Sequence, residues 1–244
     1  MPQQKRASDE QLQSFADRLR EAAGNNLVSL ILYGSAASGE SDSYSDLNLL
    51  CVLQDLSFSH LVPLSTVVES WIKVGQRPPL LISEKELRAS ADVFSIELLD
   101  MKQHNKVLFG KNLLNEIVVP MHAHRAQLEY ELREKLILLR QRLLAAANDD
   151  SRIADLLLHS LPAFITLFRH VLVVQGKSAP KTRAETVKIL IAESGSDADL
   201  FQQLLEARKD QKVAKNLNAK DAARQYLAFA ERLTELVDRL PDSH

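Results

Sequence analysis

The sequence predicts an α/β domain built around a small mixed sheet, followed by an all-α helical bundle. In the first half, residues 27–33 and 47–53 form short, nearly continuous apolar runs, which are typical of strands covered on both faces. From about residue 112 onward, apolar residues recur at helical spacing and the strand pattern does not return. A chain of 244 residues can bury two modest cores. We therefore predict two domains, residues 1–115 and 116–244.

The elements of both domains follow from capping residues and apolar spacing. Ser8 and Gln11 form a capping-box pattern, which predicts a first helix that ends at Gly24. The further elements predicted in the first domain are helices at residues 60–74 and 83–91 and strands at residues 80–82, 94–101 and 107–109. In the second domain, helices are predicted at residues 127–148, 151–176, 182–193, 197–208 and 221–240. Pro162 is expected to kink or divide the second of these.

The composition argues against several classes of protein. The formal net charge is −2, which gives no strong signal for a nucleic-acid or membrane partner. The single cysteine, Cys51, excludes an internal disulfide and lies in an apolar run, so a buried, inert thiol is expected. No signal-peptide core is visible, and no apolar run approaches the ~18 residues of a membrane span. The sequence therefore predicts a soluble, cytoplasmic protein.

Polar residues at the ends of the first two strands indicate a phosphate and metal site. Gly34 and Ser35 end the first strand, where a glycine lets the backbone approach an anion and free N–H groups point outward. Asp46 opens the second strand, and Asn48, two residues on, leaves the same strand face. Carboxylate and amide oxygens suit Mg²⁺, which prefers hard oxygen ligands and substrate phosphates. The pattern therefore predicts phosphoryl or nucleotidyl transfer chemistry.

These motifs resemble the DNA-polymerase-beta-like nucleotidyltransferase superfamily, in particular its small, aminoglycoside-nucleotidyltransferase-like bacterial members. The family pattern is an apolar strand, Gly-Ser, a polar loop and Asp-x-Asp or Asp-x-Glu, and residues 94–101 and 107–110 also resemble family segments. The resemblance implies a nucleotidyltransferase-like first domain that binds Mg²⁺ and ATP or another nucleoside triphosphate. It places the nucleotide at Gly34, Ser35 and Ser45 and the metal at Asp46 and Asn48. The helical domain would then supply the pocket for an acceptor of unknown identity.

The sequence also departs from the family pattern. Asn48 replaces the second carboxylate of the metal pair, and Ala36 stands where many family members carry an arginine. The family pattern also includes a third carboxylate, which acts as the general base in catalysis together with Asp46. Glu97 is the best candidate for this carboxylate, and Asp100 is the second candidate. Two hypotheses follow: transfer of a nucleoside monophosphate to a hydroxyl of a small molecule or protein, or a catalytically impaired, antitoxin-like nucleotide-binding or interaction module.

The helical half offers a minor alternative. Arg152 and His159 lie seven residues apart on one helix face, a spacing that resembles the motif of HEPN ribonucleases. His122 and His124 have near-ligand spacing without a third ligand, so a surface or junction role is expected for them, and His170 is expected in a junction or core. The leucine stripe at residues 128–143 predicts a core or dimer surface, so a homodimer is an open possibility.

Overall fold

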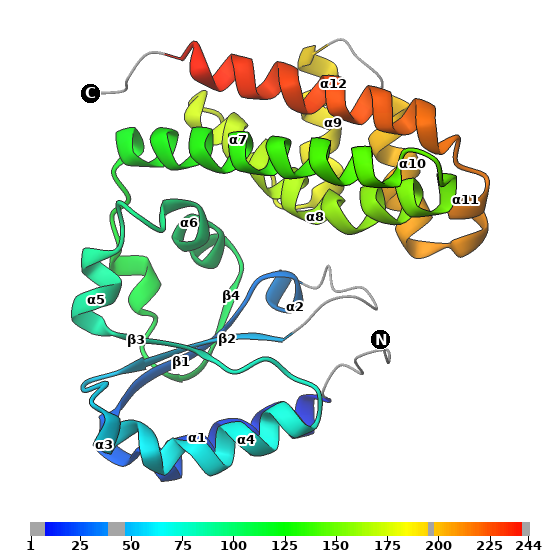
Figure 1. The fold of residues 1–244 in the computed structure, drawn as a ribbon. Helices are drawn as coiled ribbons and strands as arrows, with labels where there is room; N and C mark the ends of the chain where they lie inside the picture. The colour runs from blue at the N-terminus through cyan, green and yellow to red at the C-terminus, as the bar shows by residue number, and fades with distance from the viewer. Residues whose placement is uncertain (1–7, 39–46, 195–197, 241–244) are drawn as a thin grey trace. The chain divides into compact units, whose positions relative to one another are not determined.

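The computed structural model describes residues 8–38, 47–194 and 198–240 (Figure 1). The chain divides into two compact units, Met1–Pro120 and Met121–His244. Each unit has its own core and is described by itself.

The first unit is built on a four-stranded sheet with the order β3-β2-β1-β4. The strands are β1 (Leu27–Tyr33), β2 (Asn48–Leu53), β3 (Leu80–Ser83) and β4 (Asn105–Gly110). The central strand β1 runs antiparallel to both β2 and β4, whereas β2 and β3 are parallel. The predicted mixed sheet is therefore confirmed.

Both faces of this sheet are covered, which explains the unbroken apolar runs in β1 and β2. Successive side chains of a strand point to opposite faces, so Leu30 and Ile31 belong to two different hydrophobic clusters. One cluster includes α1 (Asp9–Ala23) and α4 (Ser65–Lys73), where Phe15 and Trp71 stack with ring centroids 4.4 Å apart. The other includes α5 (Glu84–Ala89) and α6 (Ser95–Gln103), and Figure 1 shows the two pairs of helices on opposite sides of the sheet.

Most predicted elements of the first unit are present, with altered ends. The capping box of Ser8 and Gln11 forms as expected at the start of α1. The helix predicted at residues 60–74 instead consists of α3 (Phe58–Leu61), a 3₁₀ turn at Val62–Leu64 and α4. Pro63 lies in that turn, and its missing N–H and fixed φ favour the start of a helical segment over the interior of one. The remaining short elements are α2 (Ser35–Ser38) and 3₁₀ turns at Gly24–Asn26 and Leu113–Glu116.

The strand predicted at residues 94–101 is wrong, because this segment forms the helix α6. The alternation of Phe94, Ile96 and Leu98 suits a strand, but the chain buries Ile96, Leu98 and Met101 and leaves Phe94 51% exposed. Packing against the sheet therefore selects a helical face over the strand alternation. On a strand, Glu97 and Asp100 would face opposite ways. Three residues apart on a helix, they lie on one side instead.

The second unit is entirely helical in the part that the structure describes. Its helices are α7 (Met121–Ala146), α8 (Asp150–Val174), α9 (Arg183–Ser194), α10 (Ala198–Lys209), α11 (Gln211–Lys215) and α12 (Ala219–Asp238). The helices α7, α8 and α12 pack on one another. Edge-to-face contacts of Phe168 with Phe201 and Phe229 join α8, α10 and α12 in an aromatic core. The predicted helical bundle is therefore confirmed.

The helix α8 runs through Pro162 without being divided, and a kink at this residue stays a prediction. It is also long and apolar enough to cross a membrane by length and composition, although no uninterrupted apolar run of that length was found in the sequence. Polar residues such as Ser160 and Thr166 interrupt the run but leave the average hydropathy high. Half of its most apolar window is buried inside the second unit.

Candidate functional site

The corner that follows β1 is formed by Gly34 and Ser35. Gly34 has a φ of +78°, in the left-handed region that favours glycine. Its N–H donates a hydrogen bond of 3.1 Å to the carbonyl of His104, and its own carbonyl accepts 2.9 Å from the N–H of Ala37. These two bonds fix the direction in which the chain leaves the sheet and starts α2 at Ser35. We call these two residues the Gly34–Ser35 corner.

The side chain of Asn48 lies directly against this corner. Asn48 is the first residue of β2 and pairs with Tyr33, the last residue of β1. A Cβ atom added at Gly34 would lie 3.4 Å from the amide nitrogen of Asn48. The side chain of Asn48 is half-buried, so it also remains accessible. The structure thus places Asn48 beside the Gly34–Ser35 corner.

The other predicted residues of the metal site, Ser45 and Asp46, lie outside the described residues. Within the described ranges, no group of three or more His, Cys, Asp or Glu side chains could hold a metal ion. The donor at the corner is the neutral amide of Asn48, whose oxygen is a hard ligand of the kind that Mg²⁺ accepts. A space that a Cβ would fill also separates this amide from Gly34. The atom of this amide that faces the open space is its nitrogen, a hydrogen-bond donor that fits a phosphate oxygen, so only the amide oxygen is left as a ligand for Mg²⁺.

Glu97 reaches this region from α6 rather than from a strand. Its side chain is exposed, and its charge acts on the hydroxyl of Tyr33 at the end of β1. Burial raises the pKa of Tyr33, the positive charge of Arg77 lowers it, and the negative charge of Glu97 raises it. Glu97 and Arg77 therefore both lie within electrostatic range of the residue that precedes Gly34. Asp100 is half-buried, and its carbonyl accepts the N–H of His104 at 3.0 Å.

Two residues that no pattern in the sequence marks, Asn105 and Asn112, build the corner from the side of β4. Asn105 pairs with Tyr33 across the sheet, and its amide nitrogen donates 2.8 Å to the carbonyl of Met101 at the end of α6. Its side-chain oxygen accepts 2.8 Å from Asn112. Asn105 therefore ties α6 to the strand beside the corner. Only the pairing of β4 with β1 shows what this asparagine does.

The histidines of the second unit form a buried pair. His124 was expected at a surface or junction, but it is fully buried, and its Nε2 lies 3.2 Å from Nδ1 of His170. That surface expectation is wrong for His124, because α7 begins at Met121 and turns this residue toward α8. His122 is exposed, which agrees with the surface position expected for it. His170 is buried, which agrees with the core position expected for it.

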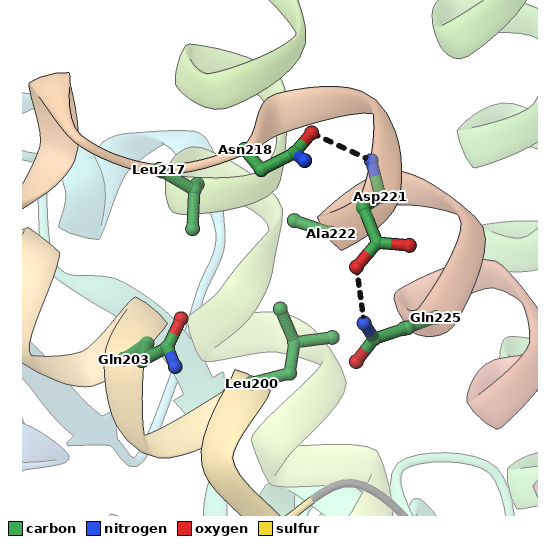
Figure 2. Close-up of a pocket in the computed structure, with 7 residues that line it drawn as sticks. All are labelled: Leu200, Gln203, Leu217, Asn218, Asp221, Ala222 and Gln225. Atoms are coloured by element: carbon green, nitrogen blue, oxygen red, sulfur yellow. Dashed lines mark hydrogen bonds between the residues drawn. The ribbon is translucent and has the colours of Figure 1, made fainter.

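A separate hollow of about 300 Å³ lies beside the start of α12 (Figure 2). Asn218 caps the helix by accepting the N–H of Asp221, and the carboxylate of Asp221 accepts 2.6 Å hydrogen bonds from Gln225 and Arg224. The hydrogen bonds from Arg224 and Gln225 lower the pKa of Asp221. The polar side chains on this side of the hollow therefore form hydrogen bonds that stabilise the start of α12.

The chain was compared with known proteins at the levels of sequence and fold. No family model matches it, and no curated protein matches its sequence. Its fold is similar to that of spectinomycin adenyltransferase AAD(9) from Enterococcus faecialis, whose crystal structure holds ATP and spectinomycin. The match has a TM-score of 0.59 and 17% sequence identity, and it covers 96% of this chain and 100% of the other. The predicted resemblance to a nucleotidyltransferase is therefore confirmed at the level of the fold.

Proposed function

We propose that this chain binds a magnesium nucleoside triphosphate, such as ATP, at the Gly34–Ser35 corner. We propose further that a hydroxyl of a small molecule or protein attacks the α-phosphorus, which transfers the nucleoside monophosphate to that oxygen and releases pyrophosphate. The observation that supports this is the open space between Gly34 and the amide of Asn48 at the ends of β1 and β2, which a Cβ at position 34 would fill. It occurs in a fold shared with a solved, ATP-bound adenyltransferase.

Each residue of the corner has a role in this proposal. The backbone of Gly34 and the hydroxyl of Ser35 would contact the phosphates, since no side chain of Gly34 blocks their approach. Asn48, with Asp46 two residues earlier, would hold Mg²⁺, which neutralises charge on the triphosphate when bound. Glu97 would accept the proton of the acceptor hydroxyl. Tyr33 and Asn105 would hold the ends of the strands in place.

Nucleotide binding is tested by two matched glycine substitutions. Gly34 and Gly176 have φ angles of +78° and +76°, so alanine costs about 1–2 kcal/mol of backbone strain at either. Only the Cβ at position 34 would enter the space beside Asn48, because nothing lies within 4 Å of the one at position 176. By isothermal titration with Mg-ATP, Gly34→Ala should bind at least about tenfold more weakly than Gly176→Ala. Equal affinities would refute a phosphate contact at Gly34.

A second candidate function is the catalytically impaired nucleotide-binding module. It is favoured by the neutral amide of Asn48 and by the place of Glu97 on a helix rather than on a catalytic strand. Loss of one metal-binding charge would weaken transition-state stabilisation by several kcal/mol.

The two candidates separate when nucleotide binding and turnover are measured on the same protein. Wild type and Asn48→Asp are incubated with Mg-ATP and a panel of hydroxyl-bearing acceptors that includes spectinomycin, with Asn48→Leu as the control. Transfer by wild type supports the enzyme, and transfer by Asn48→Asp alone supports an impaired site limited by the amide. Mg-ATP binding without transfer by either protein supports the binding module. No binding of Mg-ATP refutes both.

A further inference from the structure

A basic groove lies between α7 and α8, within the second unit. It consists of two hollows of about 240 and 350 Å³ that share Arg142, Leu156 and His159. The predicted pair of Arg152 and His159 lines the larger hollow together with Arg142. We call this feature the α7–α8 groove.

The two arginines of the α7–α8 groove are available for a ligand. Other arginines of α7 are ion-paired with α12: Arg133 lies 2.7 Å from Asp238, and Arg140 lies 2.7 Å from Glu231. Among the described residues, no carboxylate pairs with the guanidinium of Arg142 or Arg152, and both side chains are exposed. Unpaired guanidinium groups on the two walls of one hollow offer N–H donors of the kind that bind the oxygens of a phosphate.

The other charged groups of the groove leave it positive near these arginines. Asp155 is the one carboxylate that lines the larger hollow, against two guanidinium groups. Lys135, in the smaller hollow, lies 3.1 Å from Glu131 and 2.7 Å from Glu134 and is largely neutralised by them. Nδ1 of His159 lies 2.7 Å from the carbonyl of Asp155, which orients the ring on its own helix.

The smaller hollow provides an apolar end to the groove. It is lined by Leu138 and Leu139 of α7 and by Leu156, Ala163 and Phe164 of α8. Beside them, the hydroxyl of Ser160 lies 3.3 Å from that of Tyr226. A site with an apolar wall, few polar groups and a charged end suits a small molecule with a flat ring and an anionic group.

We propose that the α7–α8 groove binds a nucleoside monophosphate or a similar phosphate monoester. Arg142 and Arg152 hold the phosphate, and the apolar hollow beside Phe164 holds the base. This site is independent of the Gly34–Ser35 corner, because every residue that lines it belongs to the second unit.

The test is isothermal titration of the full chain with 5′-AMP in the absence of magnesium. The variant Arg142→Gln/Arg152→Gln should bind AMP at least about tenfold more weakly than wild type, since it loses charge-assisted hydrogen bonds. The variant Arg18→Gln/Lys209→Gln loses the same charge from exposed side chains elsewhere and should bind as wild type does. Ala163→Glu, in the apolar hollow, should weaken AMP more than inorganic phosphate.

Several outcomes would overturn the proposal. The first is the absence of AMP binding at millimolar concentration. The second is an AMP affinity of Arg142→Gln/Arg152→Gln that lies within twofold of the affinity of the control variant Arg18→Gln/Lys209→Gln. Equal affinities for AMP and inorganic phosphate would reduce the groove to an anion site without a base pocket. Loss of AMP binding in Gly34→Ala, with binding kept in the double arginine variant, would place AMP at the first unit instead. Because Mg-ATP binding is measured separately on Gly34→Ala, failure of either proposal is distinguishable.

Discussion

Three glycines with almost the same backbone angle allow the cost of side-chain crowding to be measured apart from backbone strain. Gly34, Gly110 and Gly176 have φ angles of +78°, +75° and +76°. Alanine at any of them costs about 1–2 kcal/mol in strain. The added Cβ would meet the amide of Asn48 at 3.4 Å at position 34 and nothing within 4 Å at position 176. At position 110 it would lie 2.1 Å from the carbonyl oxygen of Val28.

The contact at position 110 cannot be relieved by a rotamer change, because the carbonyl belongs to the backbone of β1. Relief requires β4 to move from β1 beside the pairing of Gly110 with Ser29, whose hydroxyl donates 2.8 Å to the carbonyl of Lys111. Overpacking of this kind adds about 1–3 kcal/mol. We therefore expect Gly110→Ala to lower the free energy of unfolding of the first unit by about 2–5 kcal/mol.

The measurement is urea unfolding followed by tryptophan fluorescence, because Trp71 is the only tryptophan and lies in the core of the first unit. With a slope of about 2 kcal/mol per molar urea, a loss of about 2–5 kcal/mol shifts the midpoint by about 1–2.5 M. Gly34→Ala should lose only the strain term, and Gly176→Ala should leave this transition in place because it changes the other unit. A midpoint for Gly110→Ala equal to that of Gly34→Ala would refute the argument.

Three further predictions concern buried groups. Burial raises the pKa of Cys51 to about 12, so a thiol reagent at pH 8 should label it only in unfolded protein, and rapid labelling in native buffer would contradict its burial. Because the unfolded thiol ionises first, stability should fall as pH rises from about 9 toward 12, measured by urea unfolding with Cys51→Ala as the control. In the second unit, His124→Leu or His170→Leu alone should each cost about 1–3 kcal/mol by breaking their hydrogen bond. The double variant should cost less than the sum in a thermal unfolding cycle, and additive losses would show that the two rings are not coupled.

The spacing of the apolar residues predicted the fold class, because buried strands and amphipathic helices differ in the period of their apolar side chains. The runs in β1 and β2 are continuous since helices cover both faces of the sheet, and the first strand has the predicted bounds. Capping boxes placed the starts of helices equally well, because their hydrogen bonds are local: the N–H of Glu185 donates 3.1 Å to the hydroxyl of Thr182 at the start of α9.

Local sequence patterns predicted the wrong element where the apolar residues of a segment suit both a strand and a helix. The segment that forms α6 alternates like a strand, and its packing under the sheet decides for the helix. Glu97 therefore lies on a helix and not on the predicted strand. Its role as the third carboxylate stays a prediction. The Arg152–His159 ribonuclease alternative also stays a prediction, although both residues line the α7–α8 groove.

By itself, the sequence determined the two-part architecture and indicated which residues lie at the ends of the first strands. It could do so because strand and cap signals extend over only a few positions. The tertiary structure alone decided that Asn48 lies against Gly34, that His124 meets His170 and that Arg142 and Arg152 share one hollow. Such contacts join residues far apart in the chain, and they depend on register and helix rotation, which a pattern of residue types does not specify.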